Sequence, residues 1–378
     1  MAESITGSII WFLLFFVFAF FYPRIMLSQM IWKLEDATNK MEEMSHKTKI
    51  MIFKKTKKKD KNIFKKINNF MDLVVIQPSN LDPFGIVKKI DNIIRASDKR
   101  FDEFSHEIGK GLNESEIKKI NYGLRGGMSV HQIAKIMRHY VELVKKYKNL
   151  QIAMVVQMQL PMIQSIIKSE FEGTKAFLYG LPVGDSIGPL SAAYHMENPK
   201  EIEGHMAYDI KKIEGRKVIF IKASGPEPEL GRLDDTLKKL FRNHKINRVL
   251  TIDAGAKLEG EKTGSVSEGV GFAMGGIAER EILENMIMKR NIPIDSIIVK
   301  MSTEEAIKPM KTDIFKSLKE INNYILESIR RTKKGGTIVI VGVGNTIGVG
   351  NKKTVVQAVE KVVKKLNKKK VKKKKRFF

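Results

Sequence analysis

The chain has 378 residues and no cysteine, which excludes disulfides, thiol catalysis, iron–sulfur clusters and thiolate zinc sites. Apolar residues make up 43 % of it, as in folded domains. The net charge of +26 is concentrated in residues 24–66 and 361–378, which together carry +19. A duplex-binding protein is expected to carry its basic patch on a folded domain, so this distribution makes nucleic acid an unlikely partner.

The N-terminal segment is strongly apolar. Residues 4–23 contain no charge, and about 20 helical residues span roughly the 30 Å of a bilayer core. A signal peptide would need a basic start and a small-residue cleavage site, whereas Glu3 precedes this segment and Arg24 follows it. We therefore predict a transmembrane anchor over residues 1–24. Basic residues flank it only on the C-terminal side, which predicts a single-pass protein of the cell membrane with its N-terminus outside and its C-terminal domain cytoplasmic.

Residues 25–62 form a predicted juxtamembrane helix and basic linker. Apolar side chains recur there at alternating four- and three-residue steps, at Met30, Leu34, Ala37, Met41 and Met44. This short heptad seam predicts either a homodimer contact or a continuation of the membrane helix. The lysines that follow are expected to attract anionic head groups of the lipid bilayer, at about 1 kcal/mol per residue.

Residues 63–173 are predicted to form a helical domain. Asp82-Pro83 is typical of a helix start, and Asn113 and Ser129 each begin a capping box. Gly126-Gly127 is expected to separate two helices.

Side chains in this domain that could bind a metal are predicted to be structural. Met154, Met158 and Met162 are spaced by four residues; core packing is favoured over soft-metal or partner binding, and Pro161 is expected to kink or break their helix. For His131 and His139 a structural role is likewise favoured over metal binding, because no convergent ligand from a second element is evident.

Residues 174–367 alternate between short β-rich runs and amphipathic helices, which predicts an α/β domain: a three-layer, doubly wound, mainly parallel sheet. The expected strands are Ala176–Leu181, Lys217–Lys222, Arg248–Asp253, Ser296–Lys300 and Thr337–Gly342, and the expected helices are Arg232–Asn243, Glu279–Arg290, Asp313–Arg331 and Lys353–Leu366. Residues 368–378 are too basic to pack and are expected to be a disordered tail that touches lipid or nucleic acid.

Four glycine-rich loops follow the expected strands, where doubly wound folds bind ligands. They begin at Gly180, Ser224, Asp253 and Gly342, and the last one is the best anion candidate because it leads into a helix N-terminus. It is neither a Walker loop nor a strict dinucleotide fingerprint. Tight turns would explain each loop alone. The candidate ligand-binding residues are Gly184, Ser186, Lys257, Glu259, Glu261, Lys262, Glu268, Asn345 and Thr346.

Two aspartates are the candidate catalytic residues. Asp185 and Asp253 are both expected to end strands, so they could converge on one cleft. Such a pair could bind a divalent metal or divide acid and base roles. Lys257 or Lys262 could hold an anionic substrate or stabilise an oxyanion.

Longer motifs relate the chain to known families. The segments LDPFGIVKKI from Leu81, GLPVGDSIGPLSAA from Gly180 and DAGAKLEGEKTGSVSEGVG from Asp253 resemble an archaeal family of membrane-anchored proteins of unknown function, as does the run from Arg138 to Pro161. The Gly-Asp-Ser-Ile-Gly-Pro segment and the later Ile-Asp-Ala are more remotely similar to the phosphorylase/hydrolase-type fold of the germination and hydrogenase-maturation proteases.

That remote resemblance covers about half of the chain. It implies an active site that contains Asp185 and Asp253. The maturation proteases also use a nickel-sensing histidine; His195 and His205 are the nearest candidates here, and neither follows a strand as expected.

Three functions are consistent with these observations. The first is a membrane-anchored cytoplasmic α/β protein with a ligand-binding or peptidase-like hydrolase site at the aspartates. The second is a non-catalytic scaffold or adaptor that recruits an unknown protein partner through the helical region. The third, attachment of nucleic acid through the tail, ranks last because no stacking motif or reading helix accompanies the charge.

Overall fold

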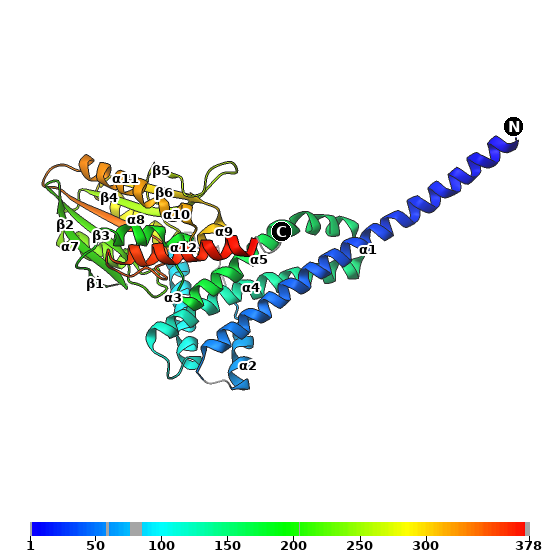
Figure 1. Cartoon of the computed structure of the whole chain (residues 1–378), viewed down its shortest axis with the longest axis horizontal. Coiled ribbons are helices and arrows are strands. Elements are labelled where there is room, and N and C mark those ends of the chain that lie inside the picture. Colours follow the sequence, from blue (N-terminus) through cyan, green and yellow to red (C-terminus); the bar gives the residue numbers. More distant parts are fainter. Residues whose placement is uncertain (1, 58–59, 76–84, 204, 375–378) are drawn as a thin grey trace.

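The computed structural model describes residues 2–57, 60–75, 85–203 and 205–374. A helical N-terminal region is followed by an α/β region, and the first helix projects far beyond both (Figure 1). The helical region contains α1 (Ala2–Lys55), α2 (Lys61–Phe70), α3 (Ile86–Ile108), α4 (Glu114–Tyr147) and α5 (Leu150–Tyr179). The expected helix start at Asp82-Pro83 lies outside the described residues.

The helix α1 changes character along its length. Its side chains from Trp11 to Ile25 are exposed, and α1 and α5 are the two described helices apolar and long enough to be candidate membrane spans. From Met30 onward one face is buried. The heptad residues Leu34 and Met41 pack against α4 and α5 of the same chain, around Val130, Ala134 and Met137. Within the described chain, this part of the seam is therefore buried against α4 and α5.

The expected break between two helices at Gly126-Gly127 is wrong, because α4 runs through both glycines. The predicted N-cap at Asn113 is confirmed: its side chain accepts a hydrogen bond from the Glu116 amide at 2.9 Å. The second predicted helix start, at Ser129, is wrong because Ser129 lies inside α4. The glycines serve close packing instead. A Cβ on Gly126 would lie 2.5 Å from Thr174 Oγ1 of α5, and one on Gly127 would lie 2.9 Å from Thr48 Cγ2 of α1.

The methionines of α5 were expected in the core, and this prediction is also wrong. Met154, Met158 and Met162 are 43 %, 75 % and 55 % exposed. The helix runs continuously through Pro161 and is arched in its first half (Figure 1). Its opposite face, with Val156 and Ile167, packs into the core around α1 and α4. His131 has structural contacts, with Ser45 Oγ at 3.1 Å and with Asp72.

The α/β region is built on a seven-stranded sheet of order β1-β2-β3-β7-β4-β6-β5. The strands are β1 (Lys200–Ile202), β2 (Met206–Ile213), β3 (Arg216–Ala223), β4 (Arg248–Ala256), β5 (Val266–Val270), β6 (Ile294–Met301) and β7 (Thr337–Gly342). Pairing is parallel from β3 through β7 and β4 to β6, and antiparallel at both edges. The sheet is therefore mixed rather than mainly parallel.

Helices cover both faces of the sheet. The short elements are η1 (Gly184–Ser186), α6 (Ile187–Ala193), α9 (Thr303–Ile307) and α10 (Thr312–Lys316), and the longer ones are α7 (Leu233–Asn243), α8 (Ile277–Met288), α11 (Leu318–Arg331) and α12 (Val355–Lys374). One core layer joins the sheet to α7 and α8, and the other joins it to α6, α10, α11 and α12. Right-handed crossovers explain the positions of α7 and α11 on opposite faces, because α7 connects β3 to β4 in one direction along the sheet and α11 lies on the connection from β6 back to β7.

Two further expectations need correction. Ala176–Leu181 is not a strand: its first residues end α5, and Gly180 caps that helix with a φ of 66°. Short apolar runs fit a buried helix as well as a strand. The basic tail is not wholly irregular, because α12 continues to Lys374.

Candidate functional site

A cavity of about 1100 Å³ lies between the helical region and the carboxyl ends of the central strands. Side chains of α3 and α4 form one wall, and the loops after β3 and β7 together with β4 form the other. The charged residues that line it are Asp91, Arg95, Asp98, Lys99, Asp102, Glu114, Lys118, Arg125, Asp185, Glu229, Arg232, Asp253 and Glu279. This is the place where open α/β sheets bind ligands.

Asp185 and Asp253 both line this cavity, as the sequence predicted, although neither ends a strand. Asp253 lies within β4, one residue beyond the last residue that pairs with β7. Asp185 lies in η1, between α5 and α6. The close approach of α6 to β4 and to the end of β7 requires glycine at residue 188. A Cβ on Gly188 would lie 2.1 Å from the Val343 carbonyl and 2.5 Å from the Ile252 carbonyl.

The protonation of the two carboxyls is strongly perturbed. Burial raises the pKa of Asp253 from 3.8 to about 7, and the nearby Asp185 carboxylate adds to the effect. Burial also raises the pKa of Asp185, against the opposing effect of a hydrogen bond at 2.7 Å from the Asn345 amide. A carboxyl with a pKa near 7 can release or accept a proton under ordinary cellular conditions.

Most amides of the loop after β7 already donate within the protein, although the sequence suggested that this loop binds an anion. The Asn345 amide donates to Asp185, and the amides of residues 343 and 346–349 donate to acceptors within the protein. The Asp185 carboxyl thus accepts the hydrogen bond that the Asn345 amide could have donated to a bound anion. Thr346 is fully buried, and its hydroxyl lies 2.8 Å from the Glu227 carbonyl. Asn345 and Thr346 therefore hold loops together.

The two other predicted residues beside Asp185 are also structural. Ser186 is fully buried, and its Oγ accepts a hydrogen bond from the Val183 amide at 3.3 Å. A Cβ on Gly184 would lie 2.2 Å from the Glu305 carbonyl, so this glycine allows η1 to approach α9.

The charged candidate residues of the loop between β4 and β5, together with Glu268 of β5, do not line the cavity. Lys257 donates to the Glu261 carbonyl at 3.4 Å, and Glu261 also pairs with Lys300. Glu268 pairs with Arg331. The two that remain, Glu259 and Lys262, are exposed to solvent. The structure therefore separates this group from Asp185 and Asp253.

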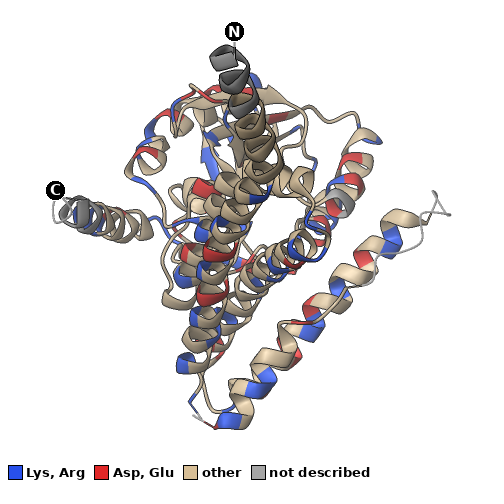
Figure 2. Cartoon of the chain, turned by 90° about the vertical axis from the view of Figure 1, so that its right-hand side faces the viewer, with Lys and Arg blue, Asp and Glu red and all other residues tan. Residues whose placement is uncertain are grey.

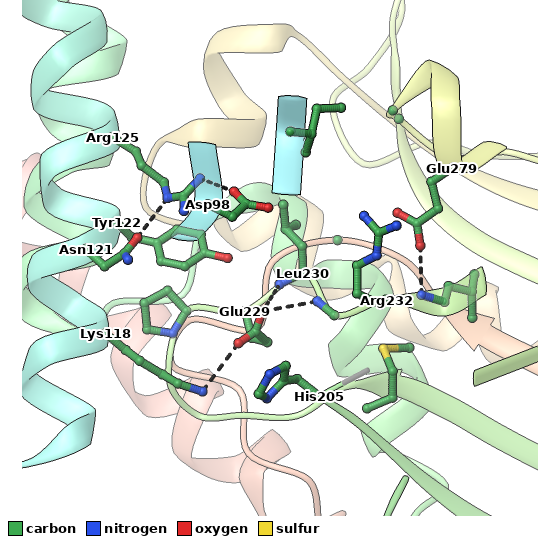
Figure 3. A pocket seen from close by; sticks show the side chains of 18 of the residues that line it. Asp98, Lys118, Asn121, Tyr122, Arg125, His205, Glu229, Leu230, Arg232 and Glu279 are labelled. Carbon is green, nitrogen blue, oxygen red and sulfur yellow. Dashed lines mark hydrogen bonds and ion pairs between the residues drawn. The ribbon is translucent and has the colours of Figure 1, made fainter. Parts of the chain in front are cut away.

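The wall that the helical region contributes was not predicted from the sequence. Figure 3 shows Lys118, Asn121, Tyr122 and Arg125 of α4 facing the loop that carries Glu229 and Leu230. Lys118 lies 3.3 Å from Glu229 and joins the two walls. The spacing of these residues along α4 is the only signal in the sequence, and it does not reveal what they face.

A short polar network orders this wall. Arg125 donates to Asn121 at 2.8 Å and pairs with Asp98 at 2.7 Å. Asn121 donates in turn to Asp102 at 2.6 Å. Burial raises the pKa of Asp102 and also that of the Tyr122 hydroxyl.

At the opposite end of the cavity, Arg232 immediately precedes α7, and Glu279 of α8 lies beside the start of that helix (Figure 3). Arg232 pairs with Asp91 of α3 at 2.8 Å. Glu279 accepts the Leu233 amide at 2.7 Å, and burial raises its pKa.

The lining carries more acid than base. Eight carboxyl groups line the cavity against five lysine and arginine side chains. The hydrogen bonds described for four of these carboxyls come from neutral donors, and burial raises the pKa of each; the four are Asp102, Asp185, Asp253 and Glu279. A positively charged ligand would favour their ionised forms.

The described part of the chain contains no group of three His, Asp or Glu side chains that could hold a metal ion. His205 lines the cavity, whereas His195 stacks on Phe220 with the ring centroids 4.6 Å apart. Burial lowers the pKa of His195 to about 4.

The fold and the cavity define a two-part protein: a helical region with candidate membrane helices, and an α/β region whose strand ends face it. The chain belongs to the DUF1512 family. A model described as the DUF1512 N-terminal domain, of a protein of unknown function, matches residues 8–180, and the DUF1512 C-terminal domain model matches residues 183–350. No curated protein and no solved structure matches the chain.

Proposed function

We propose that this protein is anchored in the membrane by α1 and binds a small cationic ligand in the cavity between its two regions. One observation carries the ligand site: Asp185 and Asp253 meet at the carboxyl ends of β4 and β7, inside a cavity large enough for a metabolite. Two buried carboxyls without a cationic hydrogen-bond partner destabilise the folded state unless they remain protonated or gain a cation.

The distribution of carboxyls favours an organic amine over a single metal ion. Asp102 belongs to the α4 wall, Glu279 lies at the opposite end, and Asp185 and Asp253 lie at the strand ends. An extended molecule with several ammonium groups can reach carboxyls on different walls. A bare metal ion needs its ligands grouped within about 2.5 Å of one point.

The anchor rests on the apolar part of α1. Its side chains from Trp11 to Ile25 project into solvent without packing on the rest of the chain, which would be costly in water. Residues 11–23 contain no charged side chain, and Figure 2 shows this part of α1 in tan, with blue and red residues farther along the helix. The basic flank supports an N-terminus outside and the cavity on the cytoplasmic side.

The test is thermal melting of the full chain in detergent micelles with spermidine, putrescine, Mn²⁺ and ATP as probes. The proposal predicts that a polyamine raises the melting temperature and that Asp253→Asn reduces the rise. Asparagine keeps the shape of the side chain but cannot become anionic.

Glu259→Gln is the matched control, because it removes an exposed carboxyl of the neighbouring loop. It should retain the full response. If no probe shifts the melting temperature, or if Asp253→Asn responds as the wild type does, the cavity is not the proposed site. A shift with Mn²⁺ alone would identify a metal and overturn the amine assignment.

Hydrolysis is a second candidate function, and one observation favours it. A pKa of about 7 suits Asp253 for transferring protons near neutral pH, with Asp185 beside it as the second carboxyl. The protease-type resemblance of the Gly-Asp-Ser-Ile-Gly-Pro segment would imply the same function. Incubation of the full chain with a fluorogenic peptide library tests this function. Cleavage must depend on both aspartates and must vary with pH around the pKa of Asp253, and cleavage that persists in the Asp253→Asn variant would count against it.

A further inference from the structure

The first half of α5 presents an apolar face that the rest of the described chain leaves uncovered. Its exposed members are Met154, Val155, Met158, Met162 and Ile166, with 36 % to 75 % of each side chain accessible. Their spacing of three and four residues places them along one side of the helix. Met158 is the most exposed of them, at 75 %.

This part of α5 is also free of charge. Residues 150–167 contain no Asp, Glu, Lys or Arg, although charged residues make up 29 % of the whole chain. Exposed helices of water-soluble regions normally carry charges on their outer face. The exposed polar side chains in this stretch are glutamines and one serine, which are neutral.

The position of α5 relative to α1 gives the depth of this face. Leu150 and Ala153 pack in one cluster with Met26 and Met30 of α1, immediately beyond its exposed apolar end. If residues 4–23 cross the hydrocarbon core, these residues of α1 lie in the head-group layer, because each residue adds about 1.5 Å along the helix. Figure 1 shows the arched first half of α5 on the side of the bundle from which α1 projects.

The turn between α4 and α5 has the composition of a membrane-interface anchor. Lys146, Tyr147 and Lys148 are exposed there, and the Lys146 ammonium lies 5.3 Å from the centre of the Tyr147 ring. Tyrosine and lysine are the residues that anchor helices at the head-group level. The first acidic side chain of α1 beyond the apolar end is Glu35, which pairs with Lys145.

We propose that the first half of α5 lies in the surface of the bilayer and is a second membrane contact beside α1. This inference rests on the proposed anchoring by α1. The bilayer is favoured over a protein partner because the face is uncharged, lies at head-group depth and is flanked by lysines and a tyrosine. Amphipathic helices in this position bury their apolar face about 5–10 Å into the boundary of the acyl chains.

This contact has a consequence for the cavity. The second half of α5 leads directly to Asp185, and α4, which forms part of the cavity wall, packs on both α1 and α5. The bilayer would thus hold α1 and the first half of α5, and α4 packs on both of these helices. The cavity would then open at a fixed distance from the membrane surface.

The chain has no cysteine, so single cysteines can be placed without further changes. Met158→Cys tests the face of α5, Phe16→Cys tests the anchor, and Val270→Cys is the matched control because it is an apolar side chain that is 96 % exposed on the edge strand β5. Each full-length variant carries an environment-sensitive fluorophore and is reconstituted in phosphatidylcholine vesicles with a minority of phosphatidylglycerol. Nitroxide-labelled lipid and aqueous iodide are the two quenchers.

The proposal predicts that lipid nitroxide quenches the label at Met158 at least about threefold more than the label at Val270, and that iodide shows the opposite order. If Phe16 is quenched by lipid while Met158 behaves like Val270, the α5 contact is wrong and the anchor stands. If lipid does not quench the label at Phe16, both the proposed anchor and the proposed α5 contact are wrong. A label at Met158 that is shielded from both quenchers would show that protein covers the face, which also overturns the proposal.

Discussion

Replacing Asp253 by asparagine should make the protein more stable, and more so as the pH rises. The carboxyl has a pKa of about 7 in the folded state against 3.8 for its ordinary value. The folded state therefore binds this proton more tightly than the unfolded state, so ionisation weakens folding as the pH rises from about 4 to 7. At about 1.4 kcal/mol per pKa unit, the full penalty above pH 7 is about 4 kcal/mol.

Chemical unfolding measured by circular dichroism tests this prediction, because both tryptophans lie in α1 and their fluorescence would not report on the sheet. The Asp253→Asn variant should exceed the wild type in free energy of unfolding by about 2 kcal/mol at about pH 5.5 and by about 4 kcal/mol at about pH 8. Asp185→Asn should shift in the same direction, since burial raises that pKa as well. A difference that does not change with pH would refute the reasoning.

Three further predictions concern packing and protonation elsewhere. Gly188→Ala should destabilise the fold by about 2 kcal/mol or more, because its Cβ would meet two backbone carbonyls, whereas Gly350→Ala has no atom closer than 3.8 Å and should be neutral in the same unfolding measurement. Acidification from about pH 7 to about pH 5 should cost the wild type about 2 kcal/mol through His195, whose pKa falls from 6.5 to about 4 on folding, and the His195→Phe variant should lack that part of the loss. Leu34→Ala should lower stability by about 2–5 kcal/mol without changing the molecular mass measured by light scattering, because this side chain is fully buried against α4 and α5; a change in mass would instead support a dimer through the heptad seam.

The sequence predicted correctly the four strands in the middle of the sheet, which are covered on both faces. The expected strand Thr337–Gly342 matches β7, and those at residues 217, 248 and 296 fall on β3, β4 and β6. The edge strands β1, β2 and β5 were missed. β2 and β5 carry polar or glycine residues that favour no periodic pattern, and β1 is only three residues long. Since all three edge pairings are antiparallel, the mixed nature of the sheet was lost with them.

The errors in the helical region have a common physical cause. Glycine marks a turn in an isolated sequence, but Gly126 and Gly127 lie in mid-helix because two neighbouring helices approach there. Spacing of four residues shows that Met154 and Met158 share one face, but it does not show whether protein, lipid or water covers that face.

The candidate site was partly predictable. Asp185 and Asp253 were expected to converge, and both line one cavity, even though only Asp253 belongs to a strand. The opposite wall was not predictable, because Asp102, Asn121 and Arg125 reach the cavity through the packing of α3 and α4 against the α/β region. Contacts of this kind are set by tertiary structure and leave no local motif.

The most direct test of the central claim is calorimetric titration of the full chain in detergent micelles with spermidine, near pH 6 and in two buffers of different ionisation heat. Binding of a cation in the cavity should ionise Asp253, so the wild type should release a proton and its observed heat should depend on the buffer. The Asp253→Asn variant should bind more weakly and release less. Absence of binding heat, or identical binding and proton release in both proteins, would contradict a cation site at these carboxyls.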